Sequence, residues 1–156
     1  MGVSGAGKTT AGRMLASALG WDFCEGDDLH SAANRDKMNS GVALTDEDRR
    51  PWLAAIRAIV DDYLARGQSV VIACSALKRW YREMLATDPV RVRFVWLDGS
   101  HELISRRVAA RRGHFMPPEL LASQFADLQA PTDAIRVAVT SSPAEIVATI
   151  RRELSI

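Results

Sequence analysis

The chain opens with a complete phosphate-binding loop, G-V-S-G-A-G-K-T, at residues 2–9. Every fixed position of the pattern G-x-x-x-x-G-K-[ST] is filled. Glycines let the backbone wrap closely around phosphate oxygens, so that successive N–H groups and the positive end of the next helix point at the anion. In such a loop the lysine, here Lys8, reaches the β- and γ-phosphates, and the hydroxyl, here Thr9, ligates Mg²⁺. The motif therefore predicts a nucleotide-binding strand–loop–helix unit.

ATP and Mg²⁺ are the cofactors that this loop predicts. An ordinary glycine-rich turn is the competing interpretation, but apolar residues at helical spacing follow the loop. Thr9 is the expected direct ligand of Mg²⁺, and Asp27 is expected to reach the ion through water. The expected phosphate-binding residues are Gly2, Ser4, Gly5, Ala6, Gly7, Lys8, Thr9 and Thr10.

Only Met1 precedes the loop, although a phosphate-binding loop normally follows a buried β-strand. We expect an in-frame apolar strand of about 5–8 residues upstream of Met1, because the neighbouring strands otherwise lack a central partner. A natural variant without this strand is the alternative, and it would leave a gap in the sheet.

The composition indicates one ordinary globular domain spanning residues 1–156, with 47% hydrophobic and 25% charged residues. The net charge of +1 gives no electrostatic case for binding nucleic acid, and no apolar run is long enough to cross a bilayer. Cys24 and Cys74 lie far apart in the sequence and are read as reduced thiols of a cytoplasmic protein.

Short apolar runs alternate with helical patterns, which predicts an α/β fold with a parallel sheet. Strands are expected at 21–24, 69–73, 92–97 and 135–139. Helices are expected after the phosphate loop, near 30–39, from a cap at Thr45 to Gly67, over 78–86, from Ser100 to about Arg112, from Pro117 or Pro118, and after Ser142. Pro51 is expected to kink the third helix or to mark its start.

An acidic segment, E-G-D-D-L-H at residues 25–30, follows the first predicted strand. Ligands of parallel α/β sheets bind beyond the carboxyl ends of the strands, so this segment is expected to face the phosphate loop. Asp27 is well placed to orient an acceptor hydroxyl and take its proton. A solvated acidic turn is the competing interpretation.

The segment C-S-A-L-K at residues 74–78, with Tyr81 and Arg82, follows the next strand. Ser75 is expected to cap the helix that comes after it. A capped helix N-terminus beside Lys78 and Arg82 is also a plausible site for a substrate carboxylate.

Four arginines at positions 106, 107, 111 and 112 precede G-H-F-M at 113–116. Arg107 and Arg111 share a helix face, and arginines on a closing lid offset the charge that builds up during phosphoryl transfer. Gly113 offers a hinge, and His114 is placed to touch substrate. A solvated basic helix face is the alternative.

The run F-V-W-L-D at 94–98 resembles an apolar strand that ends in a metal-binding aspartate. The strand expected beside the phosphate loop is instead 70–73. We therefore predict that Asp98 is a loop residue outside the metal site.

Together these motifs resemble the gluconate kinase (gluconokinase) family of P-loop small-molecule kinases, in order and over nearly the whole chain. The matching segments are 2–9, 25–30, Asn34 with Lys37–Met38, 41–53, 74–78 with Tyr81–Arg82, 113–116, 123–125 and 128–131. The segments L-H, C-S-A-L-K and H-F-M are the most specific. Two departures are the missing first strand and Ala130, where the family often carries an acidic residue.

The resemblance implies ATP-dependent phosphorylation of D-gluconate at its 6-hydroxyl. It also implies a three-layer fold like that of nucleoside-monophosphate kinases, a mobile lid at about 107–125, and a homodimer. The implied catalytic residues are Lys8, Asp27, Arg107 and Arg111, with Arg107 also contacting the nucleotide. The implied substrate-binding residues are Asp27, His30, Asn34, Arg49, Ser75, Lys78, Arg82 and His114. Which basic residue holds the carboxylate is left open.

Three other functions are alternatives for this sequence. A kinase of the shikimate kinase type has a similar phosphate loop, but it tends to place glycines where this chain has residues 74–78. A GTPase-type switch needs an N-K-x-D motif, which the sequence lacks. An inactive nucleotide-binding relic is the third alternative, motivated by the missing strand.

Overall fold

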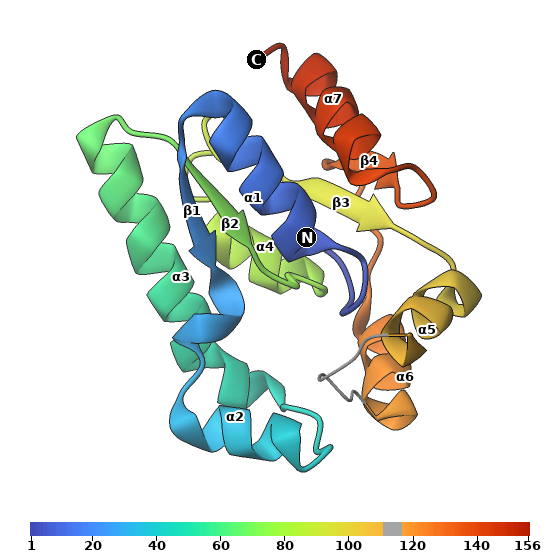
Figure 1. Cartoon of the computed structure of the whole chain (residues 1–156). Coiled ribbons are helices and arrows are strands. Elements are labelled where there is room, and N and C mark those ends of the chain that lie inside the picture. Colours follow the sequence, from blue (N-terminus) through green and yellow to red (C-terminus); the bar gives the residue numbers. More distant parts are fainter. Residues whose placement is uncertain (111–116) are drawn as a thin grey trace.

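The computed structural model describes residues 1–110 and 117–156, and it shows four short parallel strands among helices (Figure 1). The first half contains α1 (Lys8–Leu19), β1 (Asp22–Glu25), the 3₁₀ helix η1 (Gly26–Leu29), α2 (Ala32–Asn39), α3 (Asp46–Arg66) and β2 (Val70–Ala73). The second half contains α4 (Arg79–Leu85), β3 (Val95–Asp98), α5 (His101–Ala109), α6 (Pro118–Asp127), β4 (Ile135–Ala138) and α7 (Pro143–Leu154). The predicted alternation of strands and helices is confirmed.

Local capping signals account for several helix ends. Thr45 and Ser142 each form a capping box with the residue three positions on, and they start α3 and α7. Gly20 and Gly67 adopt the left-handed conformation that ends α1 and α3. Pro118 occupies the first turn of α6, as expected for proline.

Two local predictions, those for Ser75 and Asp98, are wrong. Pro51 lies inside α3 and does not mark its start, because the Thr45 capping box starts the helix at Asp46. Ser75 does not cap α4, whose N-cap is Lys78. The helix predicted from Ser100 to about Arg112 is α5, which ends at Ala109, and Arg112 lies outside the described residues. Asp98 is the last residue of β3 rather than a loop residue, because its pairing with Ala138 carries the strand to that point.

The strands form two parallel pairs. β1 pairs with β2, with Asp22 opposite Val70, and β3 pairs with β4, with Val95 opposite Ile135. The amino end of the chain lies between the two pairs: the Met1 nitrogen donates to the Val95 carbonyl at 2.5 Å, and the Gly2 nitrogen donates to the Ser75 carbonyl at 3.1 Å. The phosphate loop thus has both β2 and β3 as neighbours, not only the predicted strand at 70–73.

Two apolar clusters cover the two faces of the strands. The larger contains Ala11, Leu15 and residues of α7 such as Ile150, together with Leu97 and Val137 of the strands. The smaller lies on the other face and is built around Trp52, Leu53 and Ile56 of α3 and Tyr81 and Leu85 of α4. In this arrangement η1, α5 and the phosphate loop lie at the carboxyl ends of the strands (Figure 1).

We predict a pH dependence that originates at the amino terminus. Burial lowers the pKa of the Met1 α-amino group from its ordinary 8.0 to about 6. Between these values the unfolded chain binds more protons than the folded chain, so the free energy of unfolding should rise from pH 6 to pH 8 by roughly 2–3 kcal/mol. Chemical denaturation at several pH values measures this slope.

The Nα-acetylated chain is the control, because it has no titrating amine. It should keep only the slope that comes from His30, whose pKa is also lowered by burial. Identical slopes for the acetylated and free chains would contradict the prediction.

Candidate active site

The phosphate loop adopts a path that only glycine tolerates at its tightest point. Gly5 has φ of +82°, and a Cβ atom there would lie 2.6 Å from a methyl carbon of Val108 on α5. Gly7, with φ of +94°, is the N-cap of α1 and turns the loop into the helix. The loop therefore packs against α5 and leads directly into the N-terminus of α1. Backbone N–H groups at a helix N-terminus bind phosphate.

Two groups of the loop already bind oxygen atoms of the protein. The Ser4 nitrogen donates to Oε1 of Gln124 on α6, at 2.7 Å. The Lys8 ammonium donates to the Val3 carbonyl at 3.0 Å. An amide and an ammonium that bind oxygens in this way fit the phosphate groups of ATP. Gln124 was missed as a site residue, although it lies in one of the family segments.

Thr9 connects the phosphate loop to the acidic segment. Its hydroxyl donates to Oε2 of Glu25, the last residue of β1, at 2.7 Å. A hydroxyl and carboxylates are ligands that Mg²⁺ prefers, so Thr9 and the acidic segment fit this ion. Over residues 1–110 and 117–156, no group of three or more His, Cys, Asp or Glu side chains forms a metal site by itself. Phosphate oxygens would therefore have to complete the coordination. Sequence reasoning passed over Glu25 in favour of Asp27.

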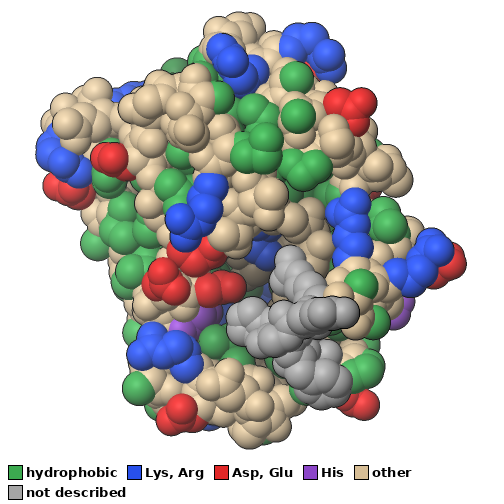
Figure 2. Space-filling model, viewed as in Figure 1, with side chains coloured by type: hydrophobic (Ala, Val, Ile, Leu, Met, Phe, Trp, Pro, Cys, Tyr) green, Lys and Arg blue, Asp and Glu red, His purple; other side chains and the backbone are tan. Residues whose placement is uncertain are grey.

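Contacts on both sides hold Asp27 in place. Gly26 sits so close to β2 that a Cβ atom would lie 2.7 Å from the Ala73 carbonyl, and its own carbonyl accepts a 2.7 Å hydrogen bond from Trp52 Nε1. The His30 nitrogen donates to the Asp27 carbonyl at 3.3 Å. Asp27 itself is exposed in η1. Figure 2 shows acidic side chains gathered on this face of the molecule.

His30 is a buried histidine at the end of this segment. Its ring stacks on Trp52 with centroids 4.5 Å apart and planes 9° apart, and only 7% of the residue is exposed. Burial lowers its pKa, against the opposing effect of Asp27, so the ring is neutral near pH 7. Its Nδ1 is buried with no hydrogen-bond partner among the described residues. Such an atom fits a polar ligand group.

Two predicted substrate-binding cations meet in one network (the cation pair, Arg49 and Lys78). Arg49 donates to the Tyr81 hydroxyl at 2.9 Å and to Asp127 at 3.0 Å. Lys78 donates to Asp46 at 2.7 Å and lies 3.4 Å from Asp127. The hydrogen bond from Lys78 lowers the pKa of Asp46, and Asp46 in turn raises the pKa of Lys78. The network therefore brings two positive charges together and balances them with two carboxylates.

One face of α6 contacts both the phosphate loop and the cation pair. Gln124 contacts the phosphate loop, and Asp127, three residues on, contacts the cation pair. The sequence offered a motif for Gln124 but none for Asp127.

Three other predicted substrate residues have structural contacts. Asn34 is buried, and its amide donates to the Asp48 carbonyl at 2.7 Å, joining α2 to α3. Arg82 is 5% exposed and donates to the carbonyls of Ala76 and Leu77 at 3.1 and 2.9 Å. The Ser75 carbonyl accepts from Gly2. These contacts hold the loops of the site, and the structure does not bring the Arg82 guanidinium to the cation pair.

The predicted arginines of the lid are only partly described. Arg107 donates to the Val139 carbonyl at 2.6 Å, so its guanidinium contacts the residue that directly follows β4. Arg111 and His114 lie outside the described residues. Asp98 is engaged by Arg136, with Nη2 and Oδ2 2.6 Å apart.

Comparison with known proteins decides the family. A family model described as an AAA domain matches residues 1–135. A probable gluconokinase of Mus musculus is 46% identical over 174 residues, covering 99% of this chain and 95% of the mouse protein. The gluconokinase of Arabidopsis thaliana is 47% identical over 165 residues, covering 96% of this chain and 87% of the plant protein. This chain belongs to the gluconokinase family.

Solved structures agree with this assignment. A gluconokinase from Sinorhizobium meliloti 1021 matches with a TM-score of 0.89 and 44% identity, covering 99% of this chain and 89% of that one. Shikimate kinase from Aquifex aeolicus vf5 matches with a TM-score of 0.59 but only 17% identity, which shows a shared fold alone. The gluconokinase family is therefore favoured over the shikimate kinase alternative.

No helix of the described residues is long and apolar enough to span a membrane.

The contact between Trp52 and Gly26 generates a prediction. Trp52→Phe keeps an aromatic ring for His30 to stack on but leaves the Gly26 carbonyl without its donor. The free energy of unfolding should fall by about 1–3 kcal/mol, and turnover should fall as the segment that carries Asp27 loosens. Denaturation and steady-state kinetics measure both effects.

Trp80→Phe is the matched control, because Trp80 lies on α4 and packs edge-on against Tyr81. A Trp52 variant that loses no more stability and activity than the Trp80 variant would show that the indole N–H does not hold the acidic segment.

Proposed function

We propose that this chain is an ATP-dependent gluconokinase that transfers the γ-phosphoryl group of ATP to the 6-hydroxyl of D-gluconate. The observation that carries the proposal is the hydrogen bond between Thr9 and Glu25, because it places the acidic segment directly beside the phosphate loop. A phosphoryl donor and a carboxylate that activates the acceptor can then share one cleft. Membership of the gluconokinase family supports gluconate as the acceptor.

The chain's own residues divide the work of the reaction. The backbone of the phosphate loop and Lys8 bind and orient the phosphates. Asp27 accepts the proton of the attacking hydroxyl. Thr9 would hold Mg²⁺, with Asp27 reaching it through water and Glu25 as an added candidate; when bound, the ion would neutralise charge on the phosphates. Arg107 and Arg111 offset charge in the transition state after the lid, at about 107–125, closes within the single domain.

The cation pair suits the carboxylate of the substrate. Arg49 and Lys78 already bind the carboxylates of Asp46 and Asp127, so a substrate carboxylate would find charge-assisted donors in place. His30 Nδ1 offers one more buried group for a hydroxyl. Ser75, Asn34, Arg82 and His114 complete the substrate residues that the family resemblance implies.

The resemblance also supports a homodimer and a cytoplasmic location. Sedimentation analysis of the purified chain tests the first, and fractionation of the source cells tests the second.

A coupled assay of ADP release tests the proposed reaction directly. Gluconate should support turnover well above that of shikimate and other sugar acids. Turnover with shikimate alone would favour the other small-acid kinase. ATP binding without turnover on any sugar acid would identify an inactive relic.

The role of Asp27 leads to a prediction. Asp27→Asn removes the proton acceptor while preserving size, so kcat should fall by at least about 10²-fold with ATP binding nearly unchanged. Steady-state kinetics and nucleotide titration measure the two quantities. Asp28→Asn, an exposed neighbour in η1, is the control and should stay near the parent. Near-parent turnover of the Asp27 variant would remove Asp27 from the mechanism.

The cation pair leads to another prediction. Lys78→Gln keeps a donor but loses the charge, so the KM for gluconate should rise by about 10-fold or more while the KM for ATP changes little. Arg79→Gln is the matched control, because Arg79 is exposed and pairs with Glu83. Equal KM values for gluconate in the two variants would place the substrate carboxylate elsewhere.

A further inference from the structure

α6 packs on the core with one face and contacts the candidate active site with another. Leu121 is buried in the larger apolar cluster, and Phe125 and Leu128, four and seven residues on, pack against that cluster. Gln124 and Asp127 point away from this stripe, to the phosphate loop and to the cation pair. Apolar packing therefore holds the helix, while its two polar contacts are made to groups that are proposed to bind substrates.

The cation pair needs carboxylates while no substrate is bound. Only 11% of the Arg49 side chain and 23% of the Lys78 side chain are exposed. Asp46 accepts from Lys78 at 2.7 Å. Asp127 accepts from Arg49 at 3.0 Å and lies 3.4 Å from Lys78. A largely buried cation without an anion is strongly destabilising, so Asp127 supplies the negative charge that a substrate carboxylate would otherwise supply.

A substrate carboxylate would be the third anion beside two cations. Asp46 and Asp127 already balance the cation pair, so a further negative charge is repelled unless one of the two carboxylates leaves. Asp46 lies on α3, the helix that carries Arg49, and it also accepts from the Tyr81 hydroxyl at 2.5 Å. Asp127 comes from a different helix. Asp127 is therefore the carboxylate that a substrate can replace.

Gln124 makes the equivalent contact at the phosphate loop. Its Oε1 atom accepts from the Ser4 nitrogen at 2.7 Å. Backbone N–H groups of such a loop bind phosphate oxygens, so a phosphate oxygen and Gln124 compete for the same donor. Gln124 and Asp127 are separated by about 4.5 Å along the helix axis, at about 1.5 Å per residue. A shift of α6 that withdraws one of these side chains therefore withdraws the other.

The carboxyl end of α6 stays attached beside the cation pair through the next residues of the chain. The Gln129 nitrogen donates to the Leu77 carbonyl at 3.0 Å, and Gln129 Oε1 accepts from the Arg79 nitrogen at 2.6 Å. These bonds flank Lys78 and involve neither Gln124 nor Asp127. The helix can exchange its two polar contacts for ligand oxygens while this end remains in place.

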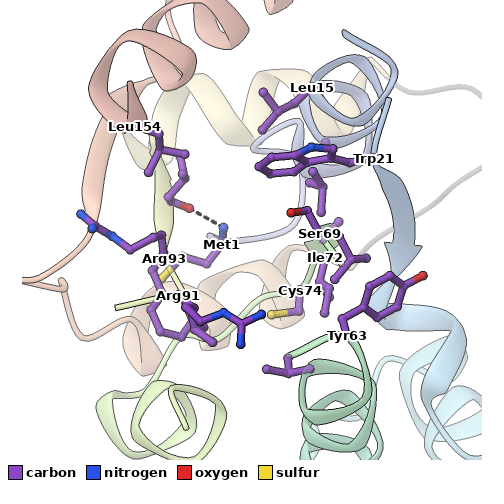
Figure 3. Close-up of a pocket in the computed structure, with 18 of the residues that line it drawn as sticks. Met1, Leu15, Trp21, Tyr63, Ser69, Ile72, Cys74, Arg91, Arg93 and Leu154 are labelled. Atoms are coloured by element: carbon purple, nitrogen blue, oxygen red, sulfur yellow. Dashed lines mark hydrogen bonds between the residues drawn. The ribbon is translucent and has the colours of Figure 1, made fainter. Parts of the chain in front are cut away.

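An apolar cavity between the strand pairs is separate from these contacts. Its volume is about 640 Å³, and it is lined by residues such as Leu15, Ile72 and Leu154 (Figure 3). Its described lining residues include none from α6 and neither member of the cation pair. The exchange of ligand oxygens on α6 therefore does not involve this cavity.

We propose that α6 couples the two substrate subsites. Asp127 occupies the position of the substrate carboxylate and Gln124 that of a phosphate oxygen, so each substrate displaces one side chain and weakens the contact of the other. ATP and gluconate then bind with positive coupling. The identity of the substrates rests on the proposed function, whereas the competition for the Ser4 nitrogen and the cation pair follows from the contacts of α6.

Isothermal titration calorimetry on the whole chain measures this coupling. The Kd of the β,γ-imido analogue of ATP, with Mg²⁺, is measured with and without gluconate, and the Kd of gluconate with and without the analogue. Each ligand should tighten the binding of the other by the same factor, about 5-fold or more, because coupling between two sites is reciprocal. A factor of one in the parent chain would overturn the proposal.

Two variants test the two contacts of α6. Asp127→Asn removes the competing charge, so gluconate should bind at least about 5-fold more tightly without nucleotide. Gln124→Ala releases the Ser4 nitrogen, so the ATP analogue should bind at least about 5-fold more tightly without gluconate. In both variants the coupling factor should fall toward one. Asp62→Asn is the matched control and should keep the parent values, because Asp62 is an exposed carboxylate of α3 that pairs with Arg66.

The direction of each change separates this proposal from a purely structural role. If Asp127 only keeps the cation pair in position, Asp127→Asn should bind gluconate more weakly, and that result would overturn the proposal. Coupling that persists at the parent factor in either variant would also overturn it. Thermal melting checks folding, and Gln124→Ala decides alone if Asp127→Asn does not fold.

The nucleotide titrations contain no gluconate, so they are independent of the proposed acceptor. A parent chain that binds no gluconate contradicts the proposed function. Unchanged affinity of Gln124→Ala for the ATP analogue contradicts the competition at Ser4, whether or not gluconate is phosphorylated.

Discussion

Three backbone hydrogen bonds at Met1 and Gly2 join the two strand pairs, and the candidate active site depends on them. Met1 contacts Val95 and Leu97 on one side, and Gly2 contacts Ser75 on the other. The phosphate loop begins at this seam, between the ends of β2 and β3. Its position relative to Glu25, at the end of β1, and Val108, on α5, follows from where the seam holds it.

The acidic segment is held by its neighbours more than by its own sequence. Gly26 approaches Ala73 closely, Trp52 donates to the Gly26 carbonyl, and His30 stacks on Trp52. These contacts leave Asp27 exposed while its flanking residues are fixed. A carboxylate held in this way can act on a substrate without first paying the entropy of becoming ordered.

Side-chain oxygen atoms of α6 contact the proposed anion-binding groups of both the phosphate loop and the cation pair. Gln124 binds the Ser4 amide of the phosphate loop, and Asp127 binds Arg49 and lies beside Lys78. The two side chains lie three residues apart on one helix, most of which falls within the segment predicted to be the lid, at about 107–125. The same helix thus contacts the places proposed for the phosphates of ATP and for the carboxylate of gluconate.

The sequence alone determined the features that depend on neighbouring residues. The phosphate loop, the helix starts at Thr45 and Ser142, the apolar run of β2 and the acidic segment after β1 were all predicted, because their signals lie within a few residues of each other. A local signal also misled: Ser75 was predicted to cap the helix whose N-cap is Lys78. Tertiary structure alone decided which charges meet. Asp127 joins Arg49 and Lys78 across the chain, Arg82 turns inward to the Ala76 and Leu77 carbonyls, and Glu25 rather than Asp27 contacts Thr9. Nothing in the spacing of these residues foretells the pairings, because each depends on the packing of elements that are distant in the sequence.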